Sequence, residues 1–61
     1  NPFVFIRLVE AYENALQVAG VQSYLHRINR ARPEHVAFME RLGFVKWHED
    51  EQGWIMKRDL Q

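Results

Sequence analysis

An apolar repeat in the first third of the chain is the feature that most constrains its fold. From Phe3 to Ala19, apolar residues return every three or four positions, which places them along one face of an α-helix. The stripe consists of Phe5, Leu8, Tyr12 and Leu16. Gly20 follows directly and suits the residue after a helix, where φ is commonly positive. The spacing therefore predicts an amphipathic helix over Phe3–Ala19 whose stripe packs against a core.

The next segment, Val21–Asn29, is typical of a β-strand. In a strand, Tyr24, His26 and Ile28 share one face. The opposite face carries Val21, Ser23, Leu25 and Arg27. Because both faces include apolar residues, we expect a strand that is covered on both sides rather than one at an exposed edge.

A second helix is predicted to begin at Pro33 and to end before Gly43. Proline is tolerated in the first turn of a helix, and Glu34 beside it favours the positive end of the helix dipole. The apolar stripe of this helix consists of Val36, Phe38 or Met39, and Leu42. Phe44 follows the terminal glycine and is placed for the hydrophobic contact that often accompanies such an ending.

Two strand-like runs, Phe44–His48 and Trp54–Leu60, predict a β-hairpin. The residues between them, Glu49–Gly53, are polar and end in glycine, which indicates a loop of four or five residues. Trp47 and Trp54 flank this loop. Their rings can pair across the two strands, or they can bind a partner, because tryptophan is enriched where binding energy concentrates.

The predicted order is α-β-α-β-β, which indicates a small α/β (α+β) domain with two helices on a small mixed sheet. The 61 residues contain no linker or repeat, so residues 1–61 are expected to form one domain. The chain begins with Asn1, and a further strand before it would complete a βαβ unit. We therefore expect a single partial domain.

Composition excludes several classes of protein. No cysteine is present, which excludes a disulfide scaffold and a thiolate metal site. Eight basic and eight acidic residues cancel, so no overall field attracts nucleic acid or a lipid surface. No apolar run approaches the roughly 20 residues of a membrane span. The three histidines match no common zinc spacing, and the acidic hairpin tip is typical of a solvated turn.

The stretch from Arg32 to Phe44 resembles a signature of the GNAT family of N-acetyltransferases. In that family a short helix closes with Leu-Gly-Phe or a similar tripeptide, and a β-hairpin then ends the domain. Leu42-Gly43-Phe44 matches the tripeptide, and Phe44–Leu60 matches the hairpin. The resemblance covers nearly the whole chain, but only the C-terminal half of a GNAT domain. The stretch His35-Val-Ala-Phe-Met is similar to phage-type members, such as the GNAT-like proteins of T7-type phage virions.

The resemblance implies a parent protein that transfers an acetyl group from acetyl-CoA to an amine. The strand near Leu25 would then hydrogen-bond the pantetheine arm of the cofactor. Arg32 and His35 would line the thiol end of the cofactor, and Arg30 is a further candidate for the cofactor site. The expected location is the cytoplasm or the inside of a phage particle.

The chain departs from the family where the family's helix-start Asn falls at Arg32, and at two further points that bear on activity. The family binds the cofactor's pyrophosphate in a Gly-rich loop ahead of its long helix, and no such loop precedes Phe3. The family's tyrosine, which protonates the leaving thiolate, falls at Met39, which has no proton to donate. These departures imply that this chain holds no catalytic residue and is inactive alone.

Three functions therefore stay open. The first is that of a fragment of an acetyl-CoA-dependent N-acetyltransferase. The alternative is a non-catalytic GNAT-like structural or interaction protein, such as an internal phage virion component. In that case a protein partner or a second copy would cover the hairpin at Trp47 and Trp54. Nucleic-acid binding through Arg27, Arg30 and Arg32 is disfavoured, because no aromatic residues interleave with these arginines.

Overall fold

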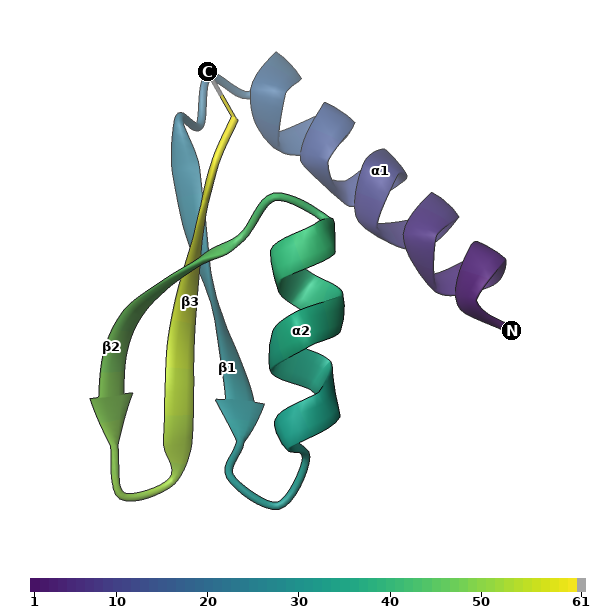
Figure 1. Cartoon of the computed structure of the whole chain (residues 1–61). Helices are drawn as coiled ribbons and strands as arrows, with labels where there is room; N and C mark the ends of the chain where they lie inside the picture. Colours follow the sequence, from purple (N-terminus) through teal and green to yellow (C-terminus); the bar gives the residue numbers. More distant parts are fainter. Residues whose placement is uncertain (61) are drawn as a thin grey trace.

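The computed structural model describes residues 1–60, which form two helices and a three-stranded sheet (Figure 1). The helices are α1 (Pro2–Val18) and α2 (Pro33–Arg41). The strands are β1 (Ser23–Asn29), β2 (Val45–Asp50) and β3 (Gly53–Asp59). The predicted order α-β-α-β-β and the α+β class are thereby confirmed. None of the helices in the described part is long and apolar enough to cross a membrane.

Both helices end at the glycines that the sequence singles out. Gly20 and Gly43 have φ values of 86° and 102°, which side chains with a Cβ rarely adopt. At the end of α2, the Gly43 N–H donates to the Glu40 carbonyl at 3.1 Å, and the Phe44 N–H donates to the Met39 carbonyl at 3.1 Å. This pair of bonds is the Schellman ending, and the equivalent pair closes α1.

The sheet is antiparallel throughout, so the prediction of a mixed sheet is wrong. Its strand order is β1-β3-β2, and both neighbouring pairs are antiparallel. The crossover through α2 does return β2 in the same direction as β1, as Figure 1 shows. The hairpin then inserts β3 between these two strands, and β3 runs opposite to both of them.

The hairpin is tighter than predicted. Asp50 pairs with Gly53, so only Glu51 and Gln52 lie between the two strands. The pairing shifts by one residue between Lys46 and His48, where β2 carries a bulge. A polar stretch therefore continues the ladder instead of forming a long loop, because the strand pairing outweighs the low strand propensity of acidic residues.

A small apolar core lies between α2 and the sheet. Ile28, Met39, Phe44 and Met56 are each no more than 3% exposed. Partly buried side chains surround them, among them Val36, Phe38, Leu42 and Trp54. The core therefore joins β1 and β3 to the apolar stripe that the sequence predicts for the second helix.

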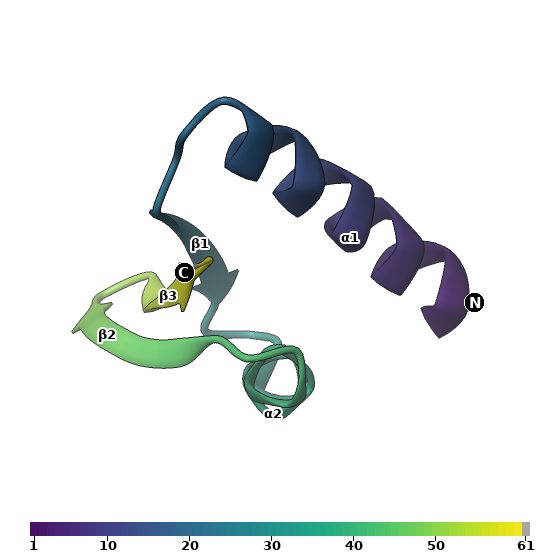
Figure 2. The same cartoon turned by 90° about the horizontal axis from the view of Figure 1, so that it is seen from above.

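Strand β1 lies at an edge of the sheet and is covered on one face only, so the prediction of a strand covered on both faces is wrong. Ile28 is 2% exposed on the face that α2 covers. Leu25, on the opposite face, is 51% exposed. Figure 2 shows both helices on the same side of the sheet, so that no element of residues 1–60 covers the other side. The presence of apolar residues on both faces of β1 therefore does not mean that both faces are buried.

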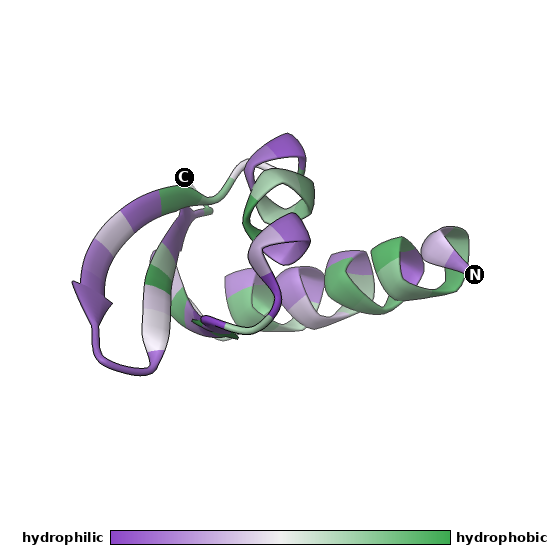
Figure 3. Cartoon of the chain, turned by 60° about the horizontal axis from the view of Figure 1, so that its bottom comes forward, coloured by the Kyte–Doolittle hydropathy of each residue, from purple (hydrophilic) through white to green (hydrophobic). Residues whose placement is uncertain are grey.

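Helix α1 buries none of its residues, so the prediction that its stripe faces a core is also wrong. Phe5, Leu8 and Tyr12 are between 40% and 64% exposed, and Leu16 is partly buried. The helix approaches the sheet at its C-terminal end and diverges from it toward its N-terminal end (Figures 1 and 2). Figure 3 shows that its hydrophobic segments continue beyond α2, where no described element covers them.

Polar contacts hold α1 to the sheet. The Tyr24 hydroxyl donates a hydrogen bond to the Glu13 carboxylate at 2.6 Å, and the Arg58 Nε donates to the same oxygen at 3.1 Å. The Gln17 amide donates to the Leu60 carbonyl at 2.8 Å. The Tyr12 and Tyr24 rings meet edge to face with their centroids 5.4 Å apart. A single carboxylate thus joins α1 to both β1 and β3.

This arrangement predicts a loss of stability in alkaline solution. Burial, followed by the bond to Glu13, raises the pKa of the Tyr24 hydroxyl above its ordinary value of 10.0. Above that pH an unfolded chain releases the proton whereas the folded chain keeps it. The contribution of the Tyr24 hydroxyl to stability is therefore fully present below pH 10.0 and is lost as the pH rises. Urea midpoints measured on both sides of this pH should fall more in the natural chain than in Tyr24→Phe. Equal declines in the two chains would contradict the assignment.

Candidate functional site

A cavity of about 810 Å³ opens between the N-terminal part of α1, strand β1 and helix α2. Its lining is mainly apolar and includes Phe5, Phe38 and Met39. Within this lining, the Phe5 ring of α1 packs against the Phe38 ring of α2, with centroids 5.7 Å apart. This volume lies within the usual range for small-molecule sites, which are mostly apolar with a few polar groups.

His26 supplies a polar group to this cavity from the sheet. The alternation along β1 places it on the helix-covered face, between Tyr24 and Ile28. Its ring packs against the buried Phe44 ring, with centroids 6.2 Å apart and planes inclined by 62°. Its partner on β3 is Met56, which is fully buried. The ring thus contacts the core on one side through Phe44, while the residue stays exposed to solvent.

Burial lowers the pKa of the His26 imidazole below its ordinary value of 6.5, and the nearby charge of His35 lowers it further. At neutral pH the His26 ring is therefore uncharged, with one nitrogen able to accept a proton. His35 lies in the first turn of α2, where its N–H donates to the Arg32 carbonyl at 3.1 Å, and it also borders the cavity. Glu34 and Arg41 complete the polar part of the rim.

The main-chain groups of Leu25 point to the open edge of β1. On β1's other edge, the Arg30 N–H donates to the Gln52 carbonyl at 2.7 Å, and the Leu60 N–H donates to the Gln22 carbonyl at 2.8 Å. Main-chain groups alternate between the two edges of an antiparallel strand. In β1, the main-chain groups of even-numbered residues therefore bond to β3, and those of odd-numbered residues such as Leu25 point to the open edge. No strand among residues 1–60 pairs with this edge.

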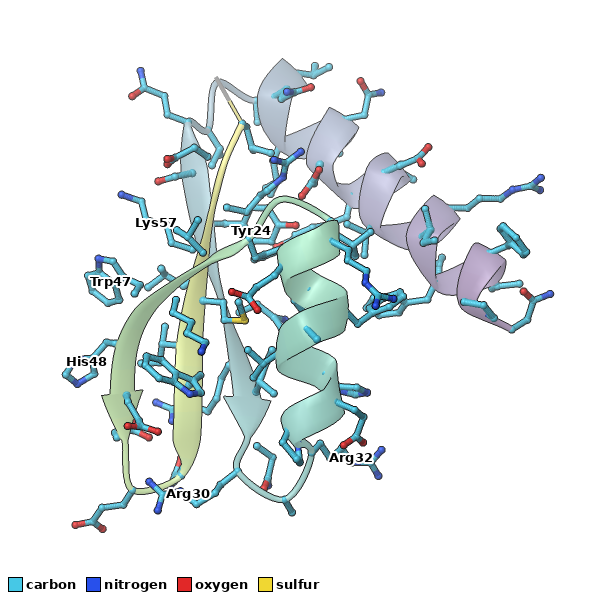
Figure 4. All side chains as sticks on the ribbon, viewed as in Figure 1. Tyr24, Arg30, Arg32, Trp47, His48 and Lys57 are labelled. Atoms are coloured by element: carbon cyan, nitrogen blue, oxygen red, sulfur yellow. The ribbon has the colours of Figure 1, made fainter. Side chains whose placement is uncertain are left out.

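The predicted arginines lie elsewhere (Figure 4). Arg30 donates from its guanidinium to the Asp50 carbonyl at 2.9 Å, at the hairpin end of the sheet. Arg27 donates to both Asp50 carboxylate oxygens, at 2.9 and 2.7 Å, and this bond is the main reason that the pKa of Asp50 lies below its ordinary value. Arg32 is exposed just before α2 and does not line the cavity.

Of the four residues predicted for the cofactor site, the structure therefore places one, His35, at the cavity. Leu25 does not line the cavity but directly precedes His26, which does, whereas Arg30 and Arg32 lie apart. Sequence reasoning missed His26 as a site residue. The sequence did contain one indication of its role. His26 lies two residues before Ile28, so in a strand it shares a face with a strongly apolar residue.

The two tryptophans do not pair across the hairpin. Trp54 lies opposite Glu49, packs against the core and has the Lys46 ammonium 5.1 Å from its ring centroid. Trp47 lies at the bulge, is 57% exposed and points away from the sheet with His48 (Figure 4). Cross-strand pairing of the two rings is therefore wrong, since the bulge changes the register.

Comparison with known proteins adds no family to these observations: no family model, curated protein or solved structure matches the chain. Among residues 1–60, no three side chains of the metal-binding types come together in a way that could hold a metal ion. The candidate site thus rests on its own geometry, which combines an apolar cavity, two imidazoles and an unpaired strand edge.

Proposed function

We propose that the chain forms part of an N-acyltransferase-like domain and takes the pantetheine arm of acetyl-CoA. The observation that carries this proposal is the position of the cavity beside the open edge of β1. An amide-containing arm can run along the main-chain groups of Leu25, as a peptide adds to a sheet edge. Its thioester end then enters the apolar cavity near His26 and His35. The resemblance of Leu42-Gly43-Phe44 and the hairpin to the GNAT family points to the same cofactor.

We propose that residues outside this chain bind the phosphates of the cofactor. A helix N-terminus binds phosphate through free main-chain N–H groups. At the start of α1, Pro2 has no N–H, and the Phe3 N–H donates to the Asn1 side chain at 2.9 Å. The Val4 N–H donates to the Asn1 carbonyl at 3.2 Å. The first turn therefore offers little to a pyrophosphate, and we propose the chain to be a fragment that is inactive alone.

Titration of the ¹⁵N-labelled chain with S-acetylpantetheine tests this function. We expect shifts of the Leu25 and Arg27 amides and of the His26 and His35 side chains, because the arm would contact the open edge and the cavity. Adenosine 3′,5′-diphosphate, which carries the cofactor's other half, should shift none of them. Shifts confined to Arg30, or none at all, would contradict the proposal.

A matched pair of variants sharpens this titration. Leu25→Pro removes the outward N–H, whereas Leu25→Ala keeps it and truncates the exposed side chain more than proline does. Because the N–H faces the open edge, its loss leaves the bonds to β3 intact. We expect Leu25→Pro to weaken binding about threefold to tenfold, which corresponds to one neutral hydrogen bond, and Leu25→Ala to have little effect.

The uncovered face of the sheet favours the alternative of a non-catalytic interaction protein. It exposes Leu25, and Val45 and Trp47 of β2 are 56% and 57% exposed. A protein partner or a second copy would remove this apolar surface from water. Such a role fits the inside of a phage particle, whereas the acyltransferase would act in the cytoplasm. A failure of S-acetylpantetheine to bind, with concentration-dependent sedimentation of the chain, would favour the alternative.

A further inference from the structure

We infer that His26 is the residue that carries the proton from the attacking amine to the leaving sulfur in this cavity. The inference rests on the proposed function and extends it, since the resemblance alone leaves the chain without a catalytic residue. It begins from Met39, where the family's tyrosine acid would fall. Met39 is 3% exposed, belongs to the core and carries no exchangeable proton.

His26 has the geometry for this role. It lines the cavity from β1, its ring is held against Phe44, and the adjacent Leu25 presents its main-chain groups to the open edge. A thioester that follows this edge into the cavity would pass beside the imidazole. His35 borders the same cavity from the first turn of α2. Both histidines are exposed, but of the two only His26 packs against an aromatic ring among residues 1–60. His26 is thus the better positioned of the two imidazoles.

The ionisable groups around His26 are compatible with a neutral ring. Helix α2 presents His35, Glu34 and Arg41 to the cavity, and Tyr24 is two residues away on the same strand face. The Tyr24 hydroxyl already donates to Glu13. The opposite residue on β3, Met56, is not ionisable. Burial lowers the pKa of His26, so its free nitrogen accepts a proton at neutral pH.

His26 alone can accept and return the proton that the acyl transfer requires. A neutral amine attacks the thioester carbonyl carbon and forms the C–N bond of a tetrahedral intermediate. The nitrogen of that intermediate gives a proton to the His26 imidazole. The carbonyl then re-forms, the C–S bond breaks, and the sulfur leaves with the bonding electron pair and takes the proton from His26. The products are an amide and a thiol, the imidazole is again neutral, and nothing is oxidised or reduced.

S-bromoacetylpantetheine tests the inference without requiring turnover. The imidazole nitrogen displaces bromide, and the resulting C–N bond marks the side chain that lies beside the thioester end. We expect peptide mass spectrometry to find the adduct on His26, formed about tenfold faster than on the exposed His48, because the bound arm raises the local concentration of the electrophile. An excess of S-acetylpantetheine should suppress this labelling, and iodoacetamide, which lacks the arm, should show no preference for His26.

Two variants, together with the titration by S-acetylpantetheine, distinguish a failure of the His26 role from a failure of the proposed function. His35→Gln should keep the adduct on His26, and His26→Gln should lose it while His48 reacts as before. Mapping on the natural chain gives the answer even if His26→Gln fails to fold. Binding of S-acetylpantetheine with labelling on His35 instead would overturn the role of His26 and leave the proposed function standing. No binding of S-acetylpantetheine would overturn the proposed function, and the role of His26 with it.

Discussion

Replacing Phe44 by alanine is expected to leave most of the chain unfolded at 25 °C. Phe44 is 2% exposed, and its ring meets the Tyr24 ring edge to face at a centroid distance of 5.4 Å. It also packs against His26, and it follows directly on the glycine that ends α2. Truncating a buried phenylalanine costs about 3–5 kcal/mol. A domain of this size has only about 5 kcal/mol of stability or less, so the loss consumes most of it.

Urea denaturation followed by far-UV circular dichroism measures this loss. The neighbouring Val45→Ala is the control, because Val45 is 56% exposed and its truncation should change stability by about 0.5 kcal/mol. Phe44→Leu keeps an apolar side chain at the same position and should cost less than the alanine variant. If Phe44→Ala unfolds at the same urea concentration as Val45→Ala, then the ring does not anchor the core.

The sequence predicts well those features of the fold that are determined by residues close together in the chain. Gly20, Pro33 and Gly43 act through their own backbone preferences, and each marks a helix boundary within one or two residues of the observed one. The prediction that Phe44 contacts the end of its helix also holds, since its N–H closes α2 and its ring enters the core. These effects need no knowledge of the rest of the fold.

The predictions that fail depend on which distant segments meet. The insertion of β3 between β1 and β2 makes the sheet antiparallel and β1 an edge strand, and no periodicity within a strand specifies that order. The stripe of α1 repeats correctly but finds little surface, because a three-stranded sheet already partly covered by α2 cannot bury it. Apolar periodicity identifies the face of a helix that can be buried, not whether a partner is present.

The candidate site is hard to predict for the same reason. Its walls come from three separated segments, around Phe5, His26 and His35, and only the tertiary arrangement brings them together. His35 could be identified because it lies in a stretch that resembles a family signature. His26 lies outside that stretch, and a single histidine on an apolar face is more often a packing residue than a functional one.

Gly53→Ala is expected to be the most damaging glycine substitution in the chain. Gly53 opens β3 with a φ of 145° and pairs with Asn29 of β1. A Cβ at this position would run into the Ile28 carbonyl oxygen and the Arg30 main-chain nitrogen. Because both are main-chain atoms of the adjacent segment, no side-chain rotation relieves the clash. The strands must separate at this end, and we expect a loss of about 3 kcal/mol or more.

Gly20→Ala is the matched control, because Gly20 also has a positive φ, of 86°, but a Cβ there would meet nothing within 4 Å. Its cost should be limited to the backbone preference, about 1–2 kcal/mol. Urea midpoints compare the two variants, and hydrogen exchange of the Arg30 amide, which donates to Gln52 at 2.7 Å, reports on the end of the sheet directly. In Gly53→Ala this amide should lose its protection, whereas in Gly20→Ala it should keep it. Equal costs for the two variants, with the Arg30 amide protected in both, would mean that β1 and β3 do not approach each other closely at Gly53. The edge position of β1, on which the proposed cofactor site depends, would then have to be reconsidered.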